Sequence, residues 1–271
     1  MQLVTTPNGI GIVEGDELRL LDVPWPDLGA VLRDQETLMS LAVAPVRERR
    51  PVTGAELRAP VLRPGKVWAI GLNYKSHIEE TGRDTPTEPM VFIKVTSAVV
   101  GSGTPVRLPP IAREKVDFEG ELAVVIGRRA SYVDEASAWS HVAGITACND
   151  LSARDVQYTT NNFGLAKSFD GFCPLGGSLI TPDELSDADD VGLRTLVNGE
   201  VRQQARSSDL LFDVPYLVSW LSYRTTLEPG DVISTGTPAG VGHPEGRYLQ
   251  AGDTVEIQLE RALPLVNTLV A

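Results

Sequence analysis

The residues most suited to chemistry are carboxylates at the start of an apolar segment, residues 116–126. If this segment is one strand, its side chains alternate between two faces, and Asp117, Glu119 and Glu121 share a face. Carboxylates two residues apart on a strand are about 6.6 Å from each other, so two of them can reach one ion. A hard divalent cation relieves the repulsion between buried carboxylates. The pattern indicates either a metal site or the solvated end of an edge strand.

Another carboxylate, Asp150, follows the apolar stretch 142–148 and precedes a predicted helix. An aspartate at this position often caps a helix, because its side chain accepts hydrogen bonds from the first free amides. The junction between a strand end and a helix start is also a frequent place for a functional residue. On these grounds alone, Asp150 is either a helix cap or a further ligand of the metal.

His77 and Glu80 lie three residues apart on a predicted helix and therefore share one face. A carboxylate beside an imidazole fixes its tautomer and raises its basicity, as a general base that activates water requires. An ordinary surface pair has the same spacing. The chain has three histidines; His141 lies in a predicted helix and His243 in a predicted loop, so His77 is the best placed of them.

Two lysines, Lys94 and Lys167, lie in apolar surroundings. Either can bind a substrate carboxylate or a developing enolate, although lysines that extend toward solvent show the same pattern. The glycine-rich segment 235–242 follows a predicted strand but lacks the spacing of a phosphate-binding loop. It can present backbone amides to a carboxylate, or it is simply a turn.

The elements that must position these residues are mostly strands. We predict strands at 10–13, 18–23, 66–70, 90–95, 116–126, 142–148, 193–197, 200–204, 231–234 and 254–259, and helices at 34–44, 73–80, 135–143 and 210–223. Asn73 is expected to cap its helix and Gly82 to end it, and Asn198-Gly199 predicts a type I′ hairpin. Because the strands do not alternate regularly with helices, the pattern predicts an α+β fold.

Prolines and a glycine between residues 58 and 65 predict a boundary. It divides the chain into a small N-terminal β-rich domain, residues 1–63, and a larger domain, residues 64–271. The latter carries all the candidate site residues.

The composition excludes several classes of partner. Acidic residues outnumber basic ones by 36 to 24, and the net charge of −12 argues against binding to nucleic acid or to an anionic membrane. There is no apolar run of about 18 residues and no signal-peptide pattern at the start, so we expect a cytoplasmic protein. The two cysteines, Cys148 and Cys173, match no zinc motif and are expected to be buried free thiols.

Five motifs together resemble the fumarylacetoacetate hydrolase family. They occur in the family's order over roughly residues 65–260, and they are GLNY at 71–74, DFEGELA at 117–123, NDLSARDVQ at 149–157, AKSFD at 166–170 and TGTPAGVG at 235–242. The resemblance implies a β-rich mixed-sheet fold of that family's C-terminal type, a homodimer, and Mg²⁺ or Mn²⁺ as cofactor.

The resemblance also implies roles for individual residues. It places Glu119, Glu121 and Asp150 on the metal, with Asp117 near them but not a ligand. It places Lys167 and, further, Lys94, Arg154, Gln157 and Thr237 against substrate or metal-bound oxygens. In acylpyruvase-like members, a His–Glu pair at the positions of His77 and Glu80 activates water.

The activity implied is hydrolysis of a carbon–carbon bond in a β-diketo acid such as an acylpyruvate or fumarylpyruvate, a reaction of aromatic catabolism. The substrate is a small anionic oxo-acid, cleaved through an enolate held by the metal and Lys167. Decarboxylation of oxaloacetate, or isomerisation or hydration of a hydroxymuconate-type 2-hydroxydienoate, passes through the same enolate and remains an alternative. A non-catalytic binder of an acidic metabolite is the third hypothesis.

The chain departs from the family pattern in a few places. Val95 stands where many members have proline, and segment 261–264, expected to be the final strand, lacks their glycine. His243 follows the glycine-rich segment without belonging to the motif, and we expect it at the mouth of the pocket.

Overall fold

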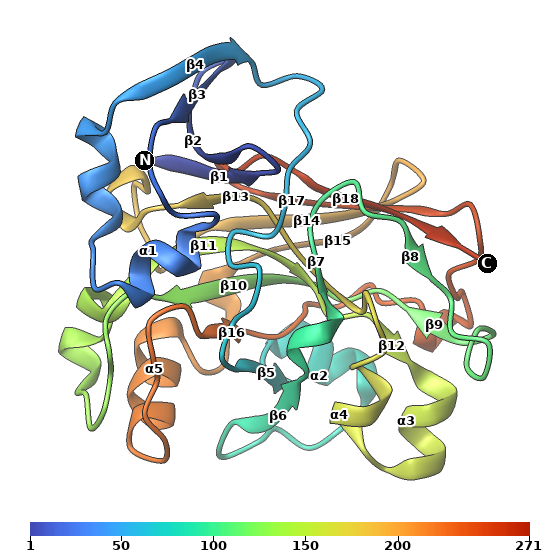
Figure 1. The fold of residues 1–271 in the computed structure, drawn as a ribbon. Helices are drawn as coiled ribbons and strands as arrows, with labels where there is room; N and C mark the ends of the chain where they lie inside the picture. Colours follow the sequence, from blue (N-terminus) through green and yellow to red (C-terminus); the bar gives the residue numbers. More distant parts are fainter.

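The computed structural model describes all 271 residues, and more of them lie in strands than in helices (Figure 1). The strands are β1 (Gln2–Thr6), β2 (Gly9–Glu14), β3 (Glu17–Leu21), β4 (Val46–Pro51), β5 (Val67–Gly71), β6 (Met90–Lys94), β7 (Val99–Val100), β8 (Val106–Arg107), β9 (Val116–Asp117), β10 (Gly120–Ile126), β11 (Val142–Asn149), β12 (Ser152–Ala153), β13 (Cys173–Ile180), β14 (Gly192–Val197), β15 (Glu200–Arg206), β16 (Val232–Ser234), β17 (Thr254–Leu259) and β18 (Leu265–Val270). The α-helices are α1 (Leu28–Arg33), α2 (Lys75–Thr81), α3 (Arg154–Thr160), α4 (Phe163–Ala166) and α5 (Val214–Ser222). No helix is both long and apolar enough to cross a lipid bilayer.

The strands form two large sheets and a small two-stranded one. The larger sheet has the order β4-β3-β2-β1-β13-β11-β10-β16-β5-β6, with β7 also paired to β13, and the second has the order β15-β14-β17-β18-β8. Most pairs are antiparallel, but β16–β5, β13–β7 and β18–β8 are parallel. This arrangement confirms the predicted α+β class with mixed, strand-rich sheets.

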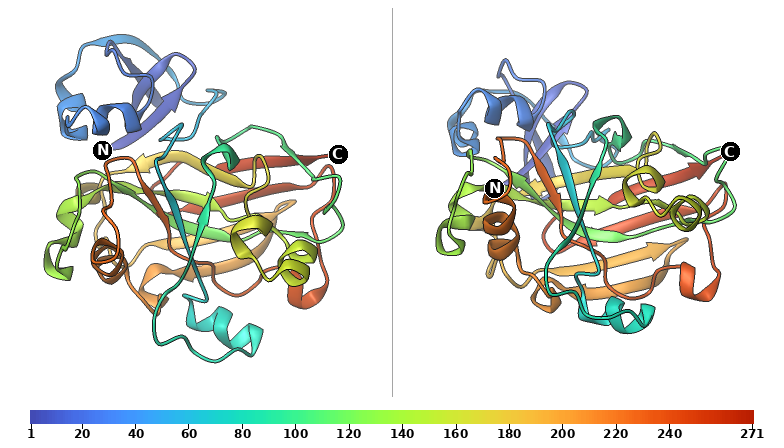
Figure 2. Two further views of the ribbon diagram at one scale, coloured as in Figure 1. Left: turned by 60° about the horizontal axis from the view of Figure 1, so that its bottom comes forward. Right: turned by 90° about the horizontal axis from the view of Figure 1, so that it is seen from below.

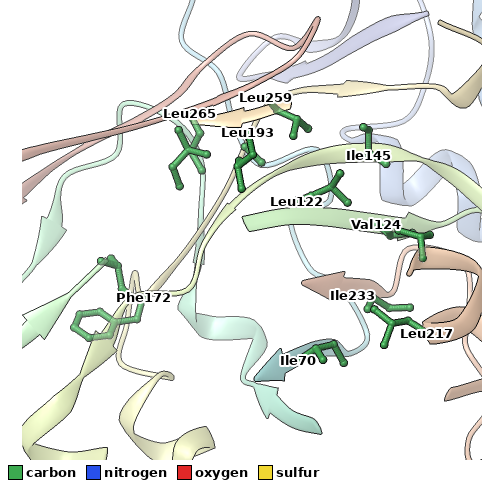
Figure 3. Close-up of a cluster of buried hydrophobic side chains, with 14 of the residues drawn as sticks. Ile70, Leu122, Val124, Ile145, Phe172, Leu193, Leu217, Ile233, Leu259 and Leu265 are labelled. Carbon is green, nitrogen blue, oxygen red and sulfur yellow. The ribbon is translucent and has the colours of Figure 1, made fainter. Parts of the chain in front are cut away.

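Strand β10 is the centre of the molecule, because both of its faces are buried. Leu122 and Val124 pack in a cluster with residues of the five-stranded sheet, such as Leu193 of β14 (Figure 3). On the other face, Ala123 and Val125 join a second cluster with α1 and the N-terminal strands. A strand covered on both sides needs a continuous apolar sequence rather than an alternating one. That requirement explains the uniform apolar run after Glu121.

The N-terminal strands lie at one end of the molecule (blue in Figure 2). They continue the larger sheet, since β1 pairs with β2 on one side and with β13 on the other, Gln2 opposite Ile180. The division into domains of residues 1–63 and 64–271 stays a proposal.

Most predicted strands are present, and the hairpin of β14 and β15 has both turn residues, Asn198 and Gly199, at positive φ (52° and 83°), as a type I′ turn requires. Gly82 ends α2 in the left-handed conformation, as expected. The free, buried state of Cys148 and Cys173 is also confirmed.

Other local predictions are wrong. No α-helix forms at 34–44, where one was expected. Helix α1, capped by the Asp27 side chain, ends at Arg33, and only a 3₁₀ helix, Leu38–Val43, follows. The helix expected at 135–143 is also a 3₁₀ helix, Glu135–His141. The last strand is β18, after the segment 261–264.

Gly120 marks a tight contact between the two sheets. A Cβ atom placed there would lie 1.9 Å from Thr195 Oγ1 of β14. Gly120→Ala is therefore expected to lower the free energy of unfolding, measured by urea denaturation, by about 1–3 kcal/mol.

Thr195 provides the matched control, because its buried hydroxyl has no hydrogen-bond partner. Thr195→Ala removes the nearest atom and should recover most of the loss when combined with Gly120→Ala. An equal loss with and without Thr195→Ala would show that this contact does not limit the space at Gly120.

Candidate active site

Three carboxylates meet where β10 begins and β11 ends. Because these strands are antiparallel neighbours, Glu121 pairs with Cys148 and so lies next to Asp150. One oxygen from each of Glu119, Glu121 and Asp150 lies within 4.8 Å of the others, and all three residues are buried. The structure thus brings together the three side chains that the sequence analysis assigned to a metal.

The three carboxylates are oriented by a break between β9 and β10, not by the alternation of side chains along one continuous strand. The predicted strand 116–126 is interrupted at Phe118 and Glu119, and the backbone N–H of Glu119 donates to the Asn149 side chain instead of a strand partner (3.1 Å). The Glu119 carbonyl accepts from the Asp150 N–H (2.8 Å). The prediction that Asp117 shares a face with Glu119 and Glu121 on one continuous strand is therefore wrong.

Asp117 instead holds the neighbouring guanidinium. Its carboxylate accepts from Nε and Nη2 of Arg154 (2.9 and 2.7 Å) and from the backbone N–H groups of Gly242 and His243 (2.7 and 3.1 Å). The side chain links α3 to the segment that ends the glycine-rich loop, and it is joined to the three-carboxylate cluster only through Arg154.

Asp150 does not cap a helix. Helix α3 begins after Ala153 without a side-chain cap, and the Asp150 carboxylate is engaged by two lysines. Lys94 donates to Oδ1 and Lys167 donates to Oδ2 (2.7 Å), and both lysines are buried. The alternative of a simple helix cap is therefore excluded in this structure.

The cations are distributed unequally over the cluster. Lys167 also donates to Glu119 (2.6 Å), and Nη2 of Arg154 lies 2.6 Å from the other Glu119 oxygen. Glu121 contacts no cation; it accepts only from the Ser234 hydroxyl (2.6 Å) and the Gly236 N–H (3.0 Å). One buried negative charge is thus left without an ionic partner.

The pKa shifts follow from this distribution. Burial by itself raises the pKa of Glu119, but the charges of Lys167 and Arg154 outweigh it and hold that pKa at about 2. Burial, together with the charges of Asp150 and Glu119, holds the pKa of Glu121 well above its ordinary value. Three converging carboxylates with one uncompensated charge are the donor set that a hard divalent cation prefers. The residues present therefore fit Mg²⁺ or Mn²⁺.

A cavity of about 310 Å³ opens beside the cluster. Six of the residues assigned from the sequence line it together with Glu119: His77, Glu80, Arg154, Gln157, Lys167 and Thr237. Lys94, Glu121 and Asp150 do not line this cavity. A larger groove of about 1370 Å³ lies between α1 and the loops around Arg128 and Pro182, and none of the candidate residues lines it.

His77 and Glu80 form the expected pair on α2. His77 Nδ1 lies 2.9 Å from Glu80 Oε2, and Glu80 Oε1 accepts from the Gly240 N–H (2.8 Å). Both carboxylate oxygens are therefore fixed, and Nε2 is the ring nitrogen left for exchange of a proton.

Sequence reasoning missed the residues that hold the glycine-rich loop. Asn73, expected to cap α2, instead donates to the Thr235 carbonyl (2.7 Å) and the Phe212 carbonyl (3.0 Å). Gln203 of β15 donates to Thr237 Oγ1 (2.7 Å) and accepts from Gly120 N–H (3.0 Å). No local signal distinguishes a buried glutamine in a hairpin strand from an exposed one, so only the tertiary contacts reveal it.

Comparisons with known proteins agree on one group of enzymes. The family model described as fumarylacetoacetate (FAA) hydrolase C-terminal matches residues 66–270. The chain is 43% identical over 230 residues to oxaloacetate tautomerase FAHD2A, mitochondrial, of Bos taurus, an alignment covering 83% of this chain and 72% of that protein. It is 38% identical over 273 residues to the Homo sapiens protein of the same name, covering 98% and 86%.

Solved structures share the whole fold. Maleylpyruvate hydrolase from Sphingobium sp. SYK-6, in complex with manganese (II) ion and pyruvate, is similar with a TM-score of 0.81 and 30% identity, covering 100% of this chain and 99% of that one. 5-Carboxymethyl-2-hydroxymuconate delta-isomerase from Mycobacterium smegmatis has a TM-score of 0.80 and 37% identity, with the same coverage.

Because the cations are distributed unequally, two variants that each remove one carboxylate charge are expected to differ in metal-free stability. Asp150→Asn takes a carboxylate from two buried lysines, and breaking a buried pair typically costs about 3–5 kcal/mol. Its metal-free melting temperature should fall. Glu121→Gln removes a charge that contacts no cation, and its amide oxygen can still accept from Ser234 and Gly236. Its metal-free melting temperature should be unchanged or higher.

Both variants should lose the stabilisation that Mg²⁺ or Mn²⁺ gives the wild type by binding only the folded state. The measurement is thermal denaturation after treatment with a chelator, followed by titration with each metal. A variant that keeps the wild-type, metal-dependent shift contradicts the assignment of that residue to the metal. An equal fall of the metal-free melting temperature in both variants would contradict the inference that Asp150, but not Glu121, is paired with cations.

Proposed function

This chain belongs to the fumarylacetoacetate hydrolase family, and from that premise we propose that it is a divalent-metal-dependent enzyme that interconverts the keto and enol forms of an oxaloacetate-type 2-oxo acid. Membership of the family was predicted from the sequence and is confirmed. Its relatives include a tautomerase, an isomerase and a hydrolase, all of which act on small organic acids. The choice among these reactions is the proposal.

One observation carries it: an acid–base pair lines the same small cavity as Glu119, the member of the carboxylate cluster that reaches it. His77, oriented by Glu80, lines the cavity together with Glu119 and Lys167. A tautomerase needs a base for the carbon-bound proton and a cationic environment for the oxygen that becomes negative. The cavity supplies both and requires no additional reactant.

The divalent cation, held by Glu119, Glu121 and Asp150, would supply a Lewis acid that draws electron density from the 2-oxo group. His77 Nε2 takes the proton from the carbon next to that group, and Glu80 stabilises the imidazolium that forms. Lys167 donates a hydrogen bond to Glu119 and offers positive charge to the enolate oxygen. Proton transfer to that oxygen gives the enol, and the reverse steps return the ketone.

The remaining cavity residues bind and orient the substrate. Arg154 and Gln157 are joined by a hydrogen bond (3.0 Å), and Thr237 is held by Gln203. We assign these three side chains to the oxo-acid end. Lys94 contacts Asp150 and the Lys167 carbonyl behind the cavity, so its proposed role is to position Asp150 and Lys167 rather than to touch substrate.

Carbon–carbon bond hydrolysis, which the sequence analysis favoured, is the second candidate. The similar structure of a maleylpyruvate hydrolase with manganese and pyruvate favours it specifically. In that reaction, His77 would deprotonate a water molecule that attacks the distal carbonyl, and pyruvate would leave as its enol. Decarboxylation and hydroxymuconate-type isomerisation would use the same site, and analysis of the reaction products distinguishes them from the two candidates.

We also propose a homodimer located in the cytoplasm. The edge strand β6, the residue after it and the adjoining α4 expose apolar side chains, with Ile93 46%, Val95 46% and Leu165 55% exposed. Exposed apolar side chains grouped on neighbouring elements are typical of an interface.

Replacing His77 by Ala tests the acid–base role. General-base assistance typically contributes about 10²- to 10⁴-fold, so keto–enol exchange of oxaloacetate, followed by ultraviolet absorbance, should slow by that factor. Metal-promoted decarboxylation of oxaloacetate needs no base and should change far less. Equal losses in both reactions, with metal binding intact, would mean that His77 only binds substrate.

Glu80→Gln should lower exchange in the same direction, since it removes the charge that orients the imidazole. Glu79→Gln is the matched control: Glu79 is exposed on the same helix and lies outside the cavity. Product analysis with maleylpyruvate and acylpyruvates separates the two candidates. Rapid release of pyruvate together with slow oxaloacetate exchange would replace the tautomerase proposal by hydrolysis.

A further inference from the structure

The cavity carries a cation that no group of the protein binds. Three cationic side chains line it: Arg83, Arg154 and Lys167. Arg154 is bound to Asp117, Glu119 and Gln157, and Lys167 is bound to Glu119 and Asp150. These two are therefore held at the end of the cavity beside the carboxylate cluster, where the proposed function places the oxo-acid end.

Arg83 is different, because its side chain forms no ion pair and no hydrogen bond with the protein. It follows Gly82, whose left-handed conformation ends α2 and turns the chain away from the helix axis. A guanidinium with five free donors is suited to bidentate binding of a carboxylate. In a protein with a net charge of −12, one unpaired cation at the cavity also matters for attracting an anion.

His243 provides a second free donor at the same cavity. Its Nδ1 lies 2.8 Å from the Tyr248 hydroxyl, and its ring stacks on Tyr158 with centroids 5.0 Å apart. Its backbone N–H donates to Asp117 (3.1 Å). The ring is thus held in place while Nε2 has no partner in the protein. When the Tyr248 hydroxyl donates to Nδ1, the proton of the neutral ring lies on Nε2.

Arg83 and His243 come from segments that contact each other. Helix α2 is joined to the glycine-rich loop by the hydrogen bond from Gly240 N–H to Glu80, and that loop continues to His243. The only acidic residues lining the cavity, Glu80 and Glu119, are already bound by His77, Gly240, Lys167 and Arg154. No free carboxylate competes for these donors.

Part of the cavity wall is apolar. It includes Phe92 and Phe163, whose rings stack with centroids 5.8 Å apart, and Met90. A carbon chain can lie on this wall, but a charged group cannot without losing its hydration. A substrate with a second carboxylate is therefore expected to place it at the free donors that line the same cavity.

We propose that Arg83 and His243 form a subsite for the second carboxylate of the substrate, so that the enzyme selects 2-oxo dicarboxylates over 2-oxo monocarboxylates. The subsite rests on the proposed function, since it takes the oxo-acid end to lie at the carboxylate cluster. Arg83 supplies the charge, and His243 supplies a directed hydrogen bond.

Binding of unreactive analogues tests this subsite without relying on turnover. Malate and 2-hydroxybutanoate have the same four-carbon chain and the same metal-chelating end, and only malate has a second carboxylate. Oxalate fills the chelating end alone. Dissociation constants for the three are measured by calorimetry on the full chain with saturating Mg²⁺.

The wild type should bind malate about tenfold or more tightly than 2-hydroxybutanoate, because hydrogen bonds to charged groups contribute that much. Arg83→Gln should weaken malate binding by about tenfold and leave 2-hydroxybutanoate and oxalate unchanged. His243→Phe, which keeps the stacking on Tyr158, should weaken malate binding by about threefold. Lys75→Gln removes an exposed cation from α2, the helix that precedes Arg83, outside the cavity and should change nothing.

Equal binding of malate and 2-hydroxybutanoate by the wild type would overturn the subsite while leaving the proposed function intact. So would an Arg83→Gln effect on all three ligands, or an equal effect of Lys75→Gln. Failure of oxalate to bind in the presence of Mg²⁺ or Mn²⁺ would instead overturn the proposed function, and the subsite with it.

Discussion

The structure depends on keeping four buried carboxylates in a small volume of an acidic protein. Asp117, Glu119, Glu121 and Asp150 are each at most 5% exposed. Isolated buried charges are too costly to persist, so each must be paired, hydrogen-bonded or bound to a metal. Three buried cations, from β6, α3 and the end of α4, pair with all but Glu121, which accepts hydrogen bonds from Ser234 and Gly236 instead. The elements around the site are arranged to bring these cations inward.

The backbone geometry also helps to stabilise the buried carboxylates. The break between β9 and β10 turns Glu119 toward Lys167 and Arg154, and the broken strand's amides are satisfied by side chains such as Asn149 rather than by a neighbouring strand. The glycine-rich loop is fixed from both sides, by Asn73 and by Gln203. A site held by this many hydrogen bonds is pre-organised, which reduces the reorganisation required when charge develops during the reaction.

The proposed roles offer an explanation for the different reactions of the related proteins. We assign enolate formation, a step common to tautomerisation, isomerisation and hydrolysis, to the carboxylate cluster and Lys167. In this proposal the fate of the enolate depends on whether the His77–Glu80 pair transfers a proton to carbon or activates water, and on the groups that hold the far end of the substrate. The groups proposed for that end, Arg83 and His243, follow a helix and lie in a loop, where sequence can vary without disturbing the buried charges.

The sequence by itself determined the strand-rich class, the hairpin at Asn198-Gly199, the family and the carboxylates, because these depend on local patterns and on motifs of fixed order. Tertiary structure alone decided how the motifs meet: Lys167 reaches Glu119 across 48 residues and Lys94 reaches Asp150 across 56. It also decided that Asp117 faces Arg154, that Asp150 caps no helix and that Gln203 supports Thr237. A local pattern gives each residue's spacing along the chain, whereas the pairing of buried charges is settled by contacts that form only when distant segments pack.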